Sequence, residues 1–282
     1  MKILVTGANG MLGQDLCPIL EDAGHYVIET DVDKLDITNA KQVKQVLSAE
    51  KPDMVIHCAA YTNVDKAEED LKTAELINVT GTENIADVCG KLGITLVYIS
   101  TDYVFDGESI EPYTTEDMPN PINNYGMTKY EGEEAVRSLC EKYYIARTSW
   151  LYGHHGKNFV ETMIRLADKP EIKVVDDQVG CPTWTVELAN GILKLFSKPY
   201  GTYHVCGSGF TTWYGFAKEI FEQYVSLRED EVDAAICSKL KPCTTEEFPR
   251  PAKRPKYSVM ENGGICRNWQ AALHDYLELR EV

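Results

Sequence analysis

The amino-acid sequence predicts an α/β protein: a doubly wound parallel sheet followed by a smaller C-terminal α/β cap. Two observations predict this fold. Short apolar runs alternate with segments of helical periodicity over residues 1–150, and several of these runs are apolar without interruption. A strand that is apolar on both faces is covered by helices on both sides, which is typical of parallel sheets. After about residue 150 the alternation loosens.

The first half of the chain supplies the strands and helices of the predicted sheet in regular order. The predicted strands are 2–7, 25–31, 52–60, 94–105 and 142–150. The predicted helices are 11–24, 39–51, 68–93 and a helix that begins near residue 123. Pro18 interrupts the first helix, so we expect it to be short or kinked. Thr38 or Asn39 is the expected cap of the second.

The second half is predicted to form mainly a separate region, with elements around 172–200 returning to the first sheet. Its predicted helices are 158–169, 186–197, 212–224 and 269–282, and its predicted strand is 201–207. The stretch 243–258 is irregular: three prolines lie within seven residues, and basic residues concentrate there in an acidic chain.

Composition and charge exclude several classes of protein. The 282 residues are 44% hydrophobic and 26% charged, which is ordinary for a globular protein. A net charge of −16 argues against nucleic-acid and anionic-membrane surfaces, because both need a basic face. No run approaches the ~18 apolar residues of a membrane span, and the N-terminal run is too short for a signal peptide. We therefore expect a soluble, cytoplasmic protein.

The cysteines and histidines give no sign of a metal centre. Nine cysteines are scattered, none forms a CxxC pair, and no cluster has zinc spacing. His154 and His155 are adjacent, so their side chains point apart on a strand or helix. We expect reduced, mostly buried thiols and no bound metal.

Three glycines, Gly7, Gly10 and Gly13, form a GxxGxxG loop directly after the first strand and at the start of the first helix. Together with an acid at the end of the second strand, Asp31, this is the context of a dinucleotide site, and it makes 1–150 a Rossmann domain. A carboxylate there binds the adenosine ribose and repels a 2′-phosphate, which favours NADH. Lys34 lies close enough to keep NADPH open. The alternative is a tight turn without a ligand.

The other expected cofactor contacts lie in the same loop, in the stretch after Asp31, and at the end of strand 52–60. They are Asn9, Met11, Leu12, Asp36, Ile37, Ala59, Ala60 and Thr62. The alanines are small enough for a flat ring to pass. Asp36 and its neighbours suit a helix cap equally well, and that alternative stays open.

A second constellation indicates carbonyl reduction. Tyr125 and Lys129 are four residues apart where a helix begins, so both side chains lie on one face. Thr101 lies near the end of the predicted strand 94–105, within the run Ser-Thr-Asp-Tyr, an unusual set for a buried strand end. The phenol can donate a proton, the hydroxyl can polarise a carbonyl, and the ammonium can hold a nicotinamide ribose and lower the pKa of the phenol. Without the other motifs, an exposed Tyr–Lys pair would be the simpler interpretation.

The chain resembles the extended short-chain dehydrogenase/reductases in five motifs: TGANGMLG, CAAYTNVDKAE, STDYVFDG, YGMTKYEGE and RTSWLYG. Within them it is most similar to the dTDP-4-dehydrorhamnose reductases, and the likeness continues through KNFVETM, VVDDQVGCPT, TTWYGFA and PRPAKRPKYS. The resemblance covers nearly the whole chain. It implies NAD(P)H-dependent reduction of the 4-keto group of dTDP-4-dehydro-L-rhamnose to dTDP-L-rhamnose, with the second half of the chain binding substrate.

The resemblance also assigns expected roles. The catalytic residues would be Thr101, Tyr125 and Lys129. The expected substrate contacts are Thr101, Asp102, Tyr103, Trp150, Asn158, Arg250 and Arg254. Tyr103 and Trp150 would line the sugar pocket. The arginines would meet the nucleotide diphosphate, although a solvated loop is an alternative for them.

One departure from the family concerns assembly. Some members form a magnesium-bridged dimer through acidic residues, and Asp15 and Glu187 stand near the corresponding positions. Asn190 and Gly191 occupy places where further carboxylates would be expected. We therefore expect a monomer or a metal-free homodimer.

Two other functions stay open at this stage. One is another nucleotide-sugar reductase or epimerase; a dehydratase is disfavoured because Tyr103, rather than a second acid, follows Asp102. The other is a non-catalytic regulatory subunit resembling the methionine adenosyltransferase β subunit. Turnover of the cofactor, rather than its binding, separates an enzyme from a binder.

Overall fold

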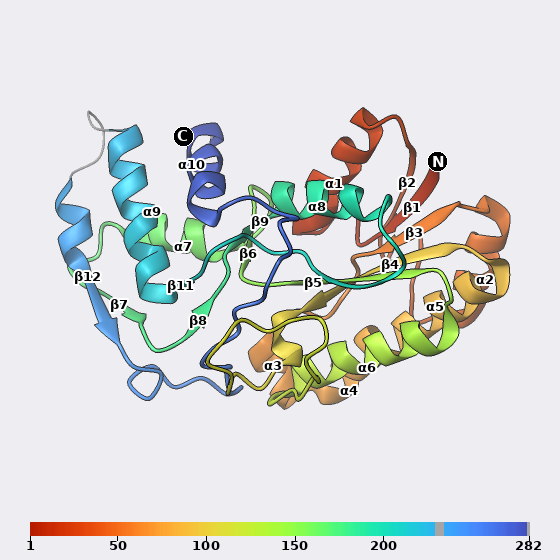
Figure 1. Cartoon of the computed structure of the whole chain (residues 1–282), viewed down its shortest axis with the longest axis horizontal. Coiled ribbons are helices and arrows are strands. Elements are labelled where there is room, and N and C mark those ends of the chain that lie inside the picture. The colour runs from red at the N-terminus through yellow and green to blue at the C-terminus, as the bar shows by residue number, and fades with distance from the viewer. Residues whose placement is uncertain (229–233, 281–282) are drawn as a thin grey trace.

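A six-stranded parallel sheet forms the centre of one half of the molecule (Figure 1), as a computed structural model of residues 1–228 and 234–280 describes it. The strand order is β10-β5-β4-β3-β1-β2, and every neighbouring pair is parallel. The strands are β1 (Lys2–Thr6), β2 (Tyr26–Thr30), β3 (Met54–His57), β4 (Thr95–Thr101), β5 (Tyr143–Thr148) and β10 (Gly201–His204). The predicted doubly wound α/β fold is confirmed.

Helices cover both faces of this sheet, which is why its strands are apolar throughout. One face is packed against α1 (Met11–Asp22) and α8 (Thr185–Leu195). The other is packed against α2 (Ala40–Glu50), α5 (Gly81–Leu92) and α6 (Asn124–Leu139) (Figure 1). Asn39, one of the two expected caps, caps α2 by accepting a hydrogen bond from the Gln42 amide. Of the two expectations for α1, a short helix is wrong, because it runs for 12 residues with Pro18 inside it. A kink at Pro18 stays a prediction.

The long helix predicted over 68–93 is largely confirmed, because residues 71–92 are helical without interruption. The prediction missed a break at Asp70 and a π-helical turn within the helix. The chain forms α3 (Val64–Glu69), α4 (Leu71–Glu75), a π-helical turn η1 (Leu76–Thr80) and then α5. Asp70 leaves the helical conformation, and its side chain caps α4 by accepting from the Thr73 amide. Within η1, Asn78 is buried and exchanges hydrogen bonds with the Tyr61 backbone. Apolar periodicity reports neither the cap at Asp70 nor the hydrogen bonds of the buried Asn78, so it missed the break and the wider turn.

The other half of the molecule packs helices against three two-stranded sheets. Its helices are α7 (Phe159–Leu166), α9 (Trp213–Leu227), η3 (Ala234–Lys239) and α10 (Trp269–Leu279). The strand pairs are β7 (Ile172–Val175) with β12 (Leu240–Cys243), β8 (Val179–Gly180) with β11 (Thr211–Thr212), and β6 (Leu151–Tyr152) with β9 (Thr183–Trp184). Phe216, Trp269 and Tyr276 lie in a second apolar core there. Predicted helix 269–282 ends at Leu279, and its last two residues lie outside the described ranges.

Segments from the second half of the chain return to the first sheet. Helix α8 packs against α1, and β10 adds a sixth strand beside β5. By contrast, β7 pairs with β12 in the other half. Within the predicted return around 172–200, α8 therefore lies beside the first sheet and β7 does not. The division near residue 150 stays a prediction.

Candidate active site

A cavity of about 610 Å³ opens beyond the carboxyl ends of the central strands. The chain runs outward from β1 to β2 on one side and continues with β3 on the other, so β1 and β3 flank a switch point where α/β folds bind ligands. Most of the predicted cofactor and catalytic residues line it: Gly7, Gly10, Met11, Leu12, Gly13, Asp31, Asp36, Ile37, Ala59, Ala60, Thr62, Thr101, Tyr125 and Lys129. Residues spread over more than 120 positions of sequence thus share one cleft.

The glycine loop has the backbone geometry that a phosphate site needs. Gly7 adopts a φ of +64°, and a Cβ there would lie 2.8 Å from the Ala59 nitrogen. Only glycine fits this close approach without strain. Gly10 precedes α1 and provides no side-chain cap. The first amides of α1 are therefore free of a capping side chain and can face an anion at the positive end of the helix dipole.

Asp31 joins the glycine loop to the end of β2. Its carboxylate accepts hydrogen bonds from the backbone amides of Asn9, at 3.1 Å, and Val32, at 2.8 Å. A carboxylate has about four acceptor sites, so it retains capacity for a ligand. Asn9 itself does not line the cavity, whereas Val32 does and is 73% exposed.

The three candidate catalytic side chains come from two adjoining elements. Thr101 is the last residue of β4, while Tyr125 and Lys129 lie in the first turns of α6. Asn123 caps α6 by accepting from the Gly126 amide at 2.7 Å. The predicted helix start and the shared face of the Tyr–Lys pair are confirmed. The Tyr103 ring stands edge-on to the Tyr125 ring, with centroids 5.7 Å apart.

Burial decides the protonation states of this pair. It raises the pKa of Tyr125 to about 12, although a side-chain hydrogen bond with Thr101 acts in the opposite direction. It also lowers the pKa of Lys129 to about 7, against the opposing effect of Glu133. The expectation that Lys129 brings the phenol pKa below its usual value is therefore wrong in this structure. A neutral phenol at pH 7 suits a proton donor.

A buried ionic cluster lies one helical turn beyond Lys129. Glu133 accepts hydrogen bonds from Ser100 Oγ at 2.6 Å, and from Arg147 Nε and Nη2 at 2.9 and 2.7 Å. Arg137 adds a further ion pair at 2.7 Å. Burial would raise the pKa of Glu133, but the hydrogen bonds and charge of Arg147 lower it, so the residue stays anionic. The cluster joins α6 to β4 and β5 beneath the catalytic residues.

Comparison with known proteins places the chain in a family. The family model described as the RmlD substrate binding domain matches residues 1–281. The chain belongs to this family. It is 43% identical over 286 residues to the spore coat polysaccharide biosynthesis protein SpsK of Bacillus subtilis, covering 99% of this chain and 98% of that protein.

Two crystal structures share the whole fold. A dTDP-4-dehydrorhamnose reductase from Clostridium acetobutylicum is 50% identical with a TM-score of 0.92, covering 99% of each chain. A dTDP-4-dehydrorhamnose reductase from Bacillus anthracis, in complex with NADP, is 43% identical with a TM-score of 0.90, covering 98% of each chain. The resemblance drawn from the motifs is confirmed, and the chain is an oxidoreductase of this nicotinamide-dependent type.

The expected substrate contacts of this family member fall into two groups. Thr101, Asp102 and Trp150 line the cavity; Tyr103, Asn158, Arg250 and Arg254 do not. Asp102 is buried and accepts hydrogen bonds from Thr101 Oγ1 at 3.0 Å and Ser258 Oγ at 2.6 Å. Burial raises its pKa to about 6. Asp102 thereby ties the end of β4 to the irregular segment 243–258.

The two arginines of that segment have different surroundings. Arg254 forms an ion pair with Asp65 of α3 and a side-chain hydrogen bond with Tyr103. The Arg250 guanidinium lies over the exposed Phe248 ring, 4.7 Å from its centroid. Their contact with a nucleotide diphosphate stays a prediction.

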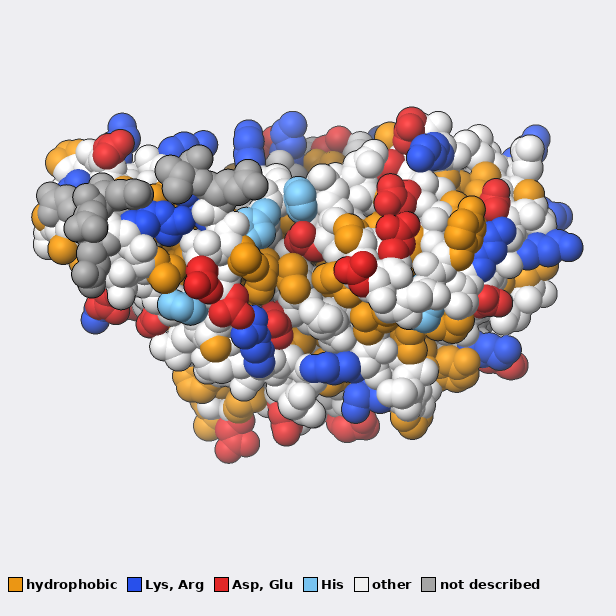
Figure 2. All heavy atoms as spheres, turned by 90° about the horizontal axis from the view of Figure 1, so that it is seen from above, with side chains coloured by type: hydrophobic (Ala, Val, Ile, Leu, Met, Phe, Trp, Pro, Cys, Tyr) orange, Lys and Arg blue, Asp and Glu red, His pale blue; other side chains and the backbone are white. Residues whose placement is uncertain are grey.

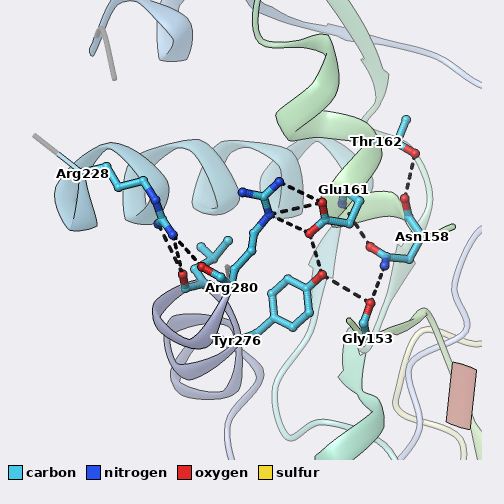
Figure 3. Close-up of polar contacts among 8 residues, drawn as sticks. Gly153, Asn158, Glu161, Thr162, Arg228, Tyr276 and Arg280 are labelled. Atoms are coloured by element: carbon cyan, nitrogen blue, oxygen red, sulfur yellow. Dashed lines mark hydrogen bonds and ion pairs between the residues drawn. The ribbon is translucent and has the colours of Figure 1, made fainter. Parts of the chain in front are cut away.

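Asn158 has a structural role at the start of α7 (Figure 3). It caps α7 by accepting from the Glu161 amide at 3.1 Å, and its own amide donates to the Gly153 carbonyl at 2.7 Å. Glu161 in turn binds Tyr276 and Arg280 of the C-terminal region. These contacts satisfy both polar ends of the Asn158 side chain, and its predicted contact with substrate is untested.

Ten further residues line the cavity without having been assigned to it: Val32, Leu35, Thr38, Cys58, Ile77, Ile99, Ser100, Thr148, Ser149 and Leu151. Most of them adjoin predicted site residues at strand ends, so extending each strand-end motif by a few positions would have found them. Ile77 is different, because it reaches the cavity from the unforeseen π-helical turn.

The sequence predicted no bound metal, and the described side chains can be compared with that prediction. Among residues 1–228 and 234–280, no group of three His, Cys, Asp or Glu side chains is placed to hold a metal. Glu187 pairs with Arg267 at 2.7 Å, and Asp15 accepts from Thr185.

All nine cysteines are free thiols, and seven are buried. No described helix has the length and apolar character needed to cross a membrane. On the face seen in Figure 2, basic side chains are interspersed with acidic ones.

Proposed function

We propose that this protein reduces the 4-keto group of dTDP-4-dehydro-L-rhamnose to dTDP-L-rhamnose, with hydride supplied by a bound reduced nicotinamide cofactor. The observation that carries this proposal is a shared cavity. The glycine loop, Asp31 and the three side chains Thr101, Tyr125 and Lys129 all line it. A reductase needs a cofactor site and a proton donor at the same carbonyl, and this cleft brings both together.

The residues at the β1–β2 end would hold the cofactor. Free amides at the start of α1 would bind its diphosphate, and the Asp31 carboxylate would accept hydrogen bonds from the adenosine ribose. Lys129 would hold the nicotinamide ribose. Because a carboxylate repels a 2′-phosphate, we propose a preference for NADH. The Bacillus anthracis relative binds NADP, so both cofactors belong in the assay.

The residues at the β4 end would transfer the proton. Thr101 polarises the carbonyl, and Tyr125 donates its phenolic proton to the oxygen as negative charge develops there. A pKa of about 12 keeps that proton in place at neutral pH. An alkoxide is a stronger base than a phenolate, so the transfer is downhill. A protonated Lys129 stabilises the phenolate that results.

The test mixes purified protein with dTDP-4-dehydro-L-rhamnose and either NADH or NADPH, and follows loss of the reduced-nicotinamide absorbance. Turnover with one cofactor, with dTDP-L-rhamnose as product, supports the proposal. Turnover only with another nucleotide sugar would show that this other sugar is the substrate. Cofactor binding without reduction of any such sugar would contradict an enzymatic function and favour a regulatory binding protein. Cytoplasmic location and a monomer or metal-free homodimer belong to the same proposal.

A further inference from the structure

Trp150 has a strained backbone at the wall of the cavity. It follows β5 with a φ of +46°, a left-handed conformation that a bulky side chain rarely adopts. Such outliers persist only where the surrounding structure fixes them, and they concentrate at functional sites. Here Ser149 Oγ donates to the Cys181 carbonyl at 2.6 Å, and the Trp150 carbonyl accepts from the Thr183 amide at 3.3 Å.

A second tryptophan stacks on the first. Trp213, at the start of α9, lies parallel to Trp150 with ring centroids 3.6 Å apart and an interplanar angle of 5°. The Phe159 ring of α7 packs beside Trp213 at 4.6 Å. Thr212 fixes the start of α9, because its hydroxyl accepts from the Gly215 amide and donates to Asp176 Oδ1 at 2.6 Å. Trp213 is therefore held independently of Trp150.

Gly180 packs against the Trp150 indole. A Cβ on Gly180 would lie 2.4 Å from Trp150 Cε2 and 2.5 Å from Nε1, a distance that real carbon atoms do not reach. The backbone of β8 thus lies directly against the indole. Gly180 pairs with Thr211 in the β8–β11 ladder, so the glycine and Trp213 belong to one unit of the second half of the molecule.

The position of Trp150 in the sheet indicates which ligand it meets. Asp31 follows β2 at one edge, whereas Trp150 follows β5, which neighbours the strand that ends in Thr101. The indole therefore bounds the catalytic end of the cleft, away from the glycine loop. Trp150 lines the cavity, so the part of the indole that Trp213 and Gly180 leave uncovered offers an apolar surface that suits the C–H groups of a sugar ring.

We propose that Trp213 and Gly180 are positioning residues, which fix the Trp150 indole as the wall against which the sugar nucleotide is oriented for reduction. This inference rests on the proposed function. It gives α9 and the TTWYGFA motif a role in substrate orientation. It also explains how a strained residue on the β5–β6 connection keeps one conformation.

The test compares wild type with Trp213→Leu and Trp213→Phe. Two stacked indoles whose transition moments are twisted within the ring planes give an exciton couplet in far-ultraviolet circular dichroism. Both variants should lose any such couplet that wild type shows. The KM for dTDP-4-dehydro-L-rhamnose should rise about tenfold in Trp213→Leu, the size of a lost aromatic contact, and less in Trp213→Phe. The Kd for NADH or NADPH should stay within about twofold, because uniform loss of stability would not spare the cofactor.

Gly180→Ala tests the same arrangement by crowding instead of truncation, and should displace the indole, weaken the couplet and raise KM. Trp269→Phe is the matched control: Trp269 is buried against Phe216 in the second core, so the variant should keep both the couplet and the wild-type KM. An unchanged KM in Trp213→Leu and in Gly180→Ala would overturn the positioning role, whether or not wild type shows the couplet. Wild type without turnover would instead refute the proposed function.

Discussion

The two ends of the cleft are built in different ways. At the nucleotide end, Gly7, Gly10 and Asp31 lie within 25 residues of one another, and the groups offered to a ligand are mainly backbone amides and one carboxylate. At the catalytic end, Trp150 lines the cleft and Tyr103 packs edge-on to Tyr125 from a separate segment. Trp150 and Tyr103 are held by residues still farther along the chain, such as Trp213 and Arg254. Local spacing therefore specifies the first end, and tertiary packing specifies the second.

The largest expected effect follows from removing the proton donor, which lies where the two ends meet. Tyr125→Phe should reduce kcat by about 10²–10⁴-fold while the Kd of the cofactor stays nearly unchanged. Steady-state kinetics and fluorescence titration measure the two quantities. Tyr200→Phe, at a half-exposed tyrosine outside the cavity lining, is the control. Equal losses in both variants, or a wild-type kcat in Tyr125→Phe, would contradict the assignment.

The next largest effect is expected from a substitution in the glycine loop, at the nucleotide end of the cleft. Gly7→Ala places a Cβ 2.8 Å from the Ala59 nitrogen at a left-handed φ, so cofactor affinity should fall by at least about tenfold and unfolding free energy by about 1–3 kcal/mol. Gly24→Ala is a matched control: its φ is +81°, but nothing lies within 4 Å. It should lose about 1 kcal/mol and keep cofactor binding. Equal cofactor affinity in both variants would refute the close-approach argument.

The buried Lys129 should make the stability of the fold depend on pH. Burial lowers the pKa of Lys129 from 10.5 to about 7, so the folded state binds fewer protons than the unfolded state between these values. The group therefore destabilises the fold most below pH 7, and stability rises as pH increases toward 10.5. The gain in urea midpoint of Lys129→Met over wild type should shrink across this interval. A constant difference at every pH would contradict the buried-lysine interpretation.

The same titration should affect ligand binding. Cofactor affinity of wild type should weaken as pH rises through about 7, because the ammonium that would hold the nicotinamide ribose becomes neutral. In Lys129→Met this dependence should disappear. Titrations at several pH values measure both.

The smallest expected effect concerns the preference between NADH and NADPH. Asp31→Asn removes the charge that would repel a 2′-phosphate, so the ratio of kcat/KM for NADPH over NADH should rise about tenfold. Asp33→Asn, at a neighbouring exposed aspartate outside the cavity lining, should leave the ratio unchanged. An unchanged ratio in Asp31→Asn would remove the basis of the proposed NADH preference.

Much of the fold could be predicted because its determinants repeat along the chain. Continuous apolar strands and amphipathic helices carry their burial pattern in the local sequence, and the predicted strands reappear as β1 to β5 and β10. In the predicted helix 68–93, residues 71–92 are helical, but the break at Asp70 and the π-helical turn around the buried Asn78 were missed. Apolar periodicity does not report side-chain caps or the hydrogen bonds of a buried amide. The lowered phenol pKa failed because burial outweighs the hydrogen bond with Thr101, and spacing does not report burial.

By itself, the sequence determined the parallel sheet, the glycine loop with its acid, and the helical face shared by Tyr125 and Lys129. Each depends on residues within one supersecondary unit, so backbone geometry fixes their separation. Only the tertiary structure decided which side chains would surround them. Glu133 meets Arg147, Asp102 meets Ser258, and Trp150 stacks on Trp213. These contacts join elements that are distant along the chain, and their geometry follows from the packing of the whole molecule.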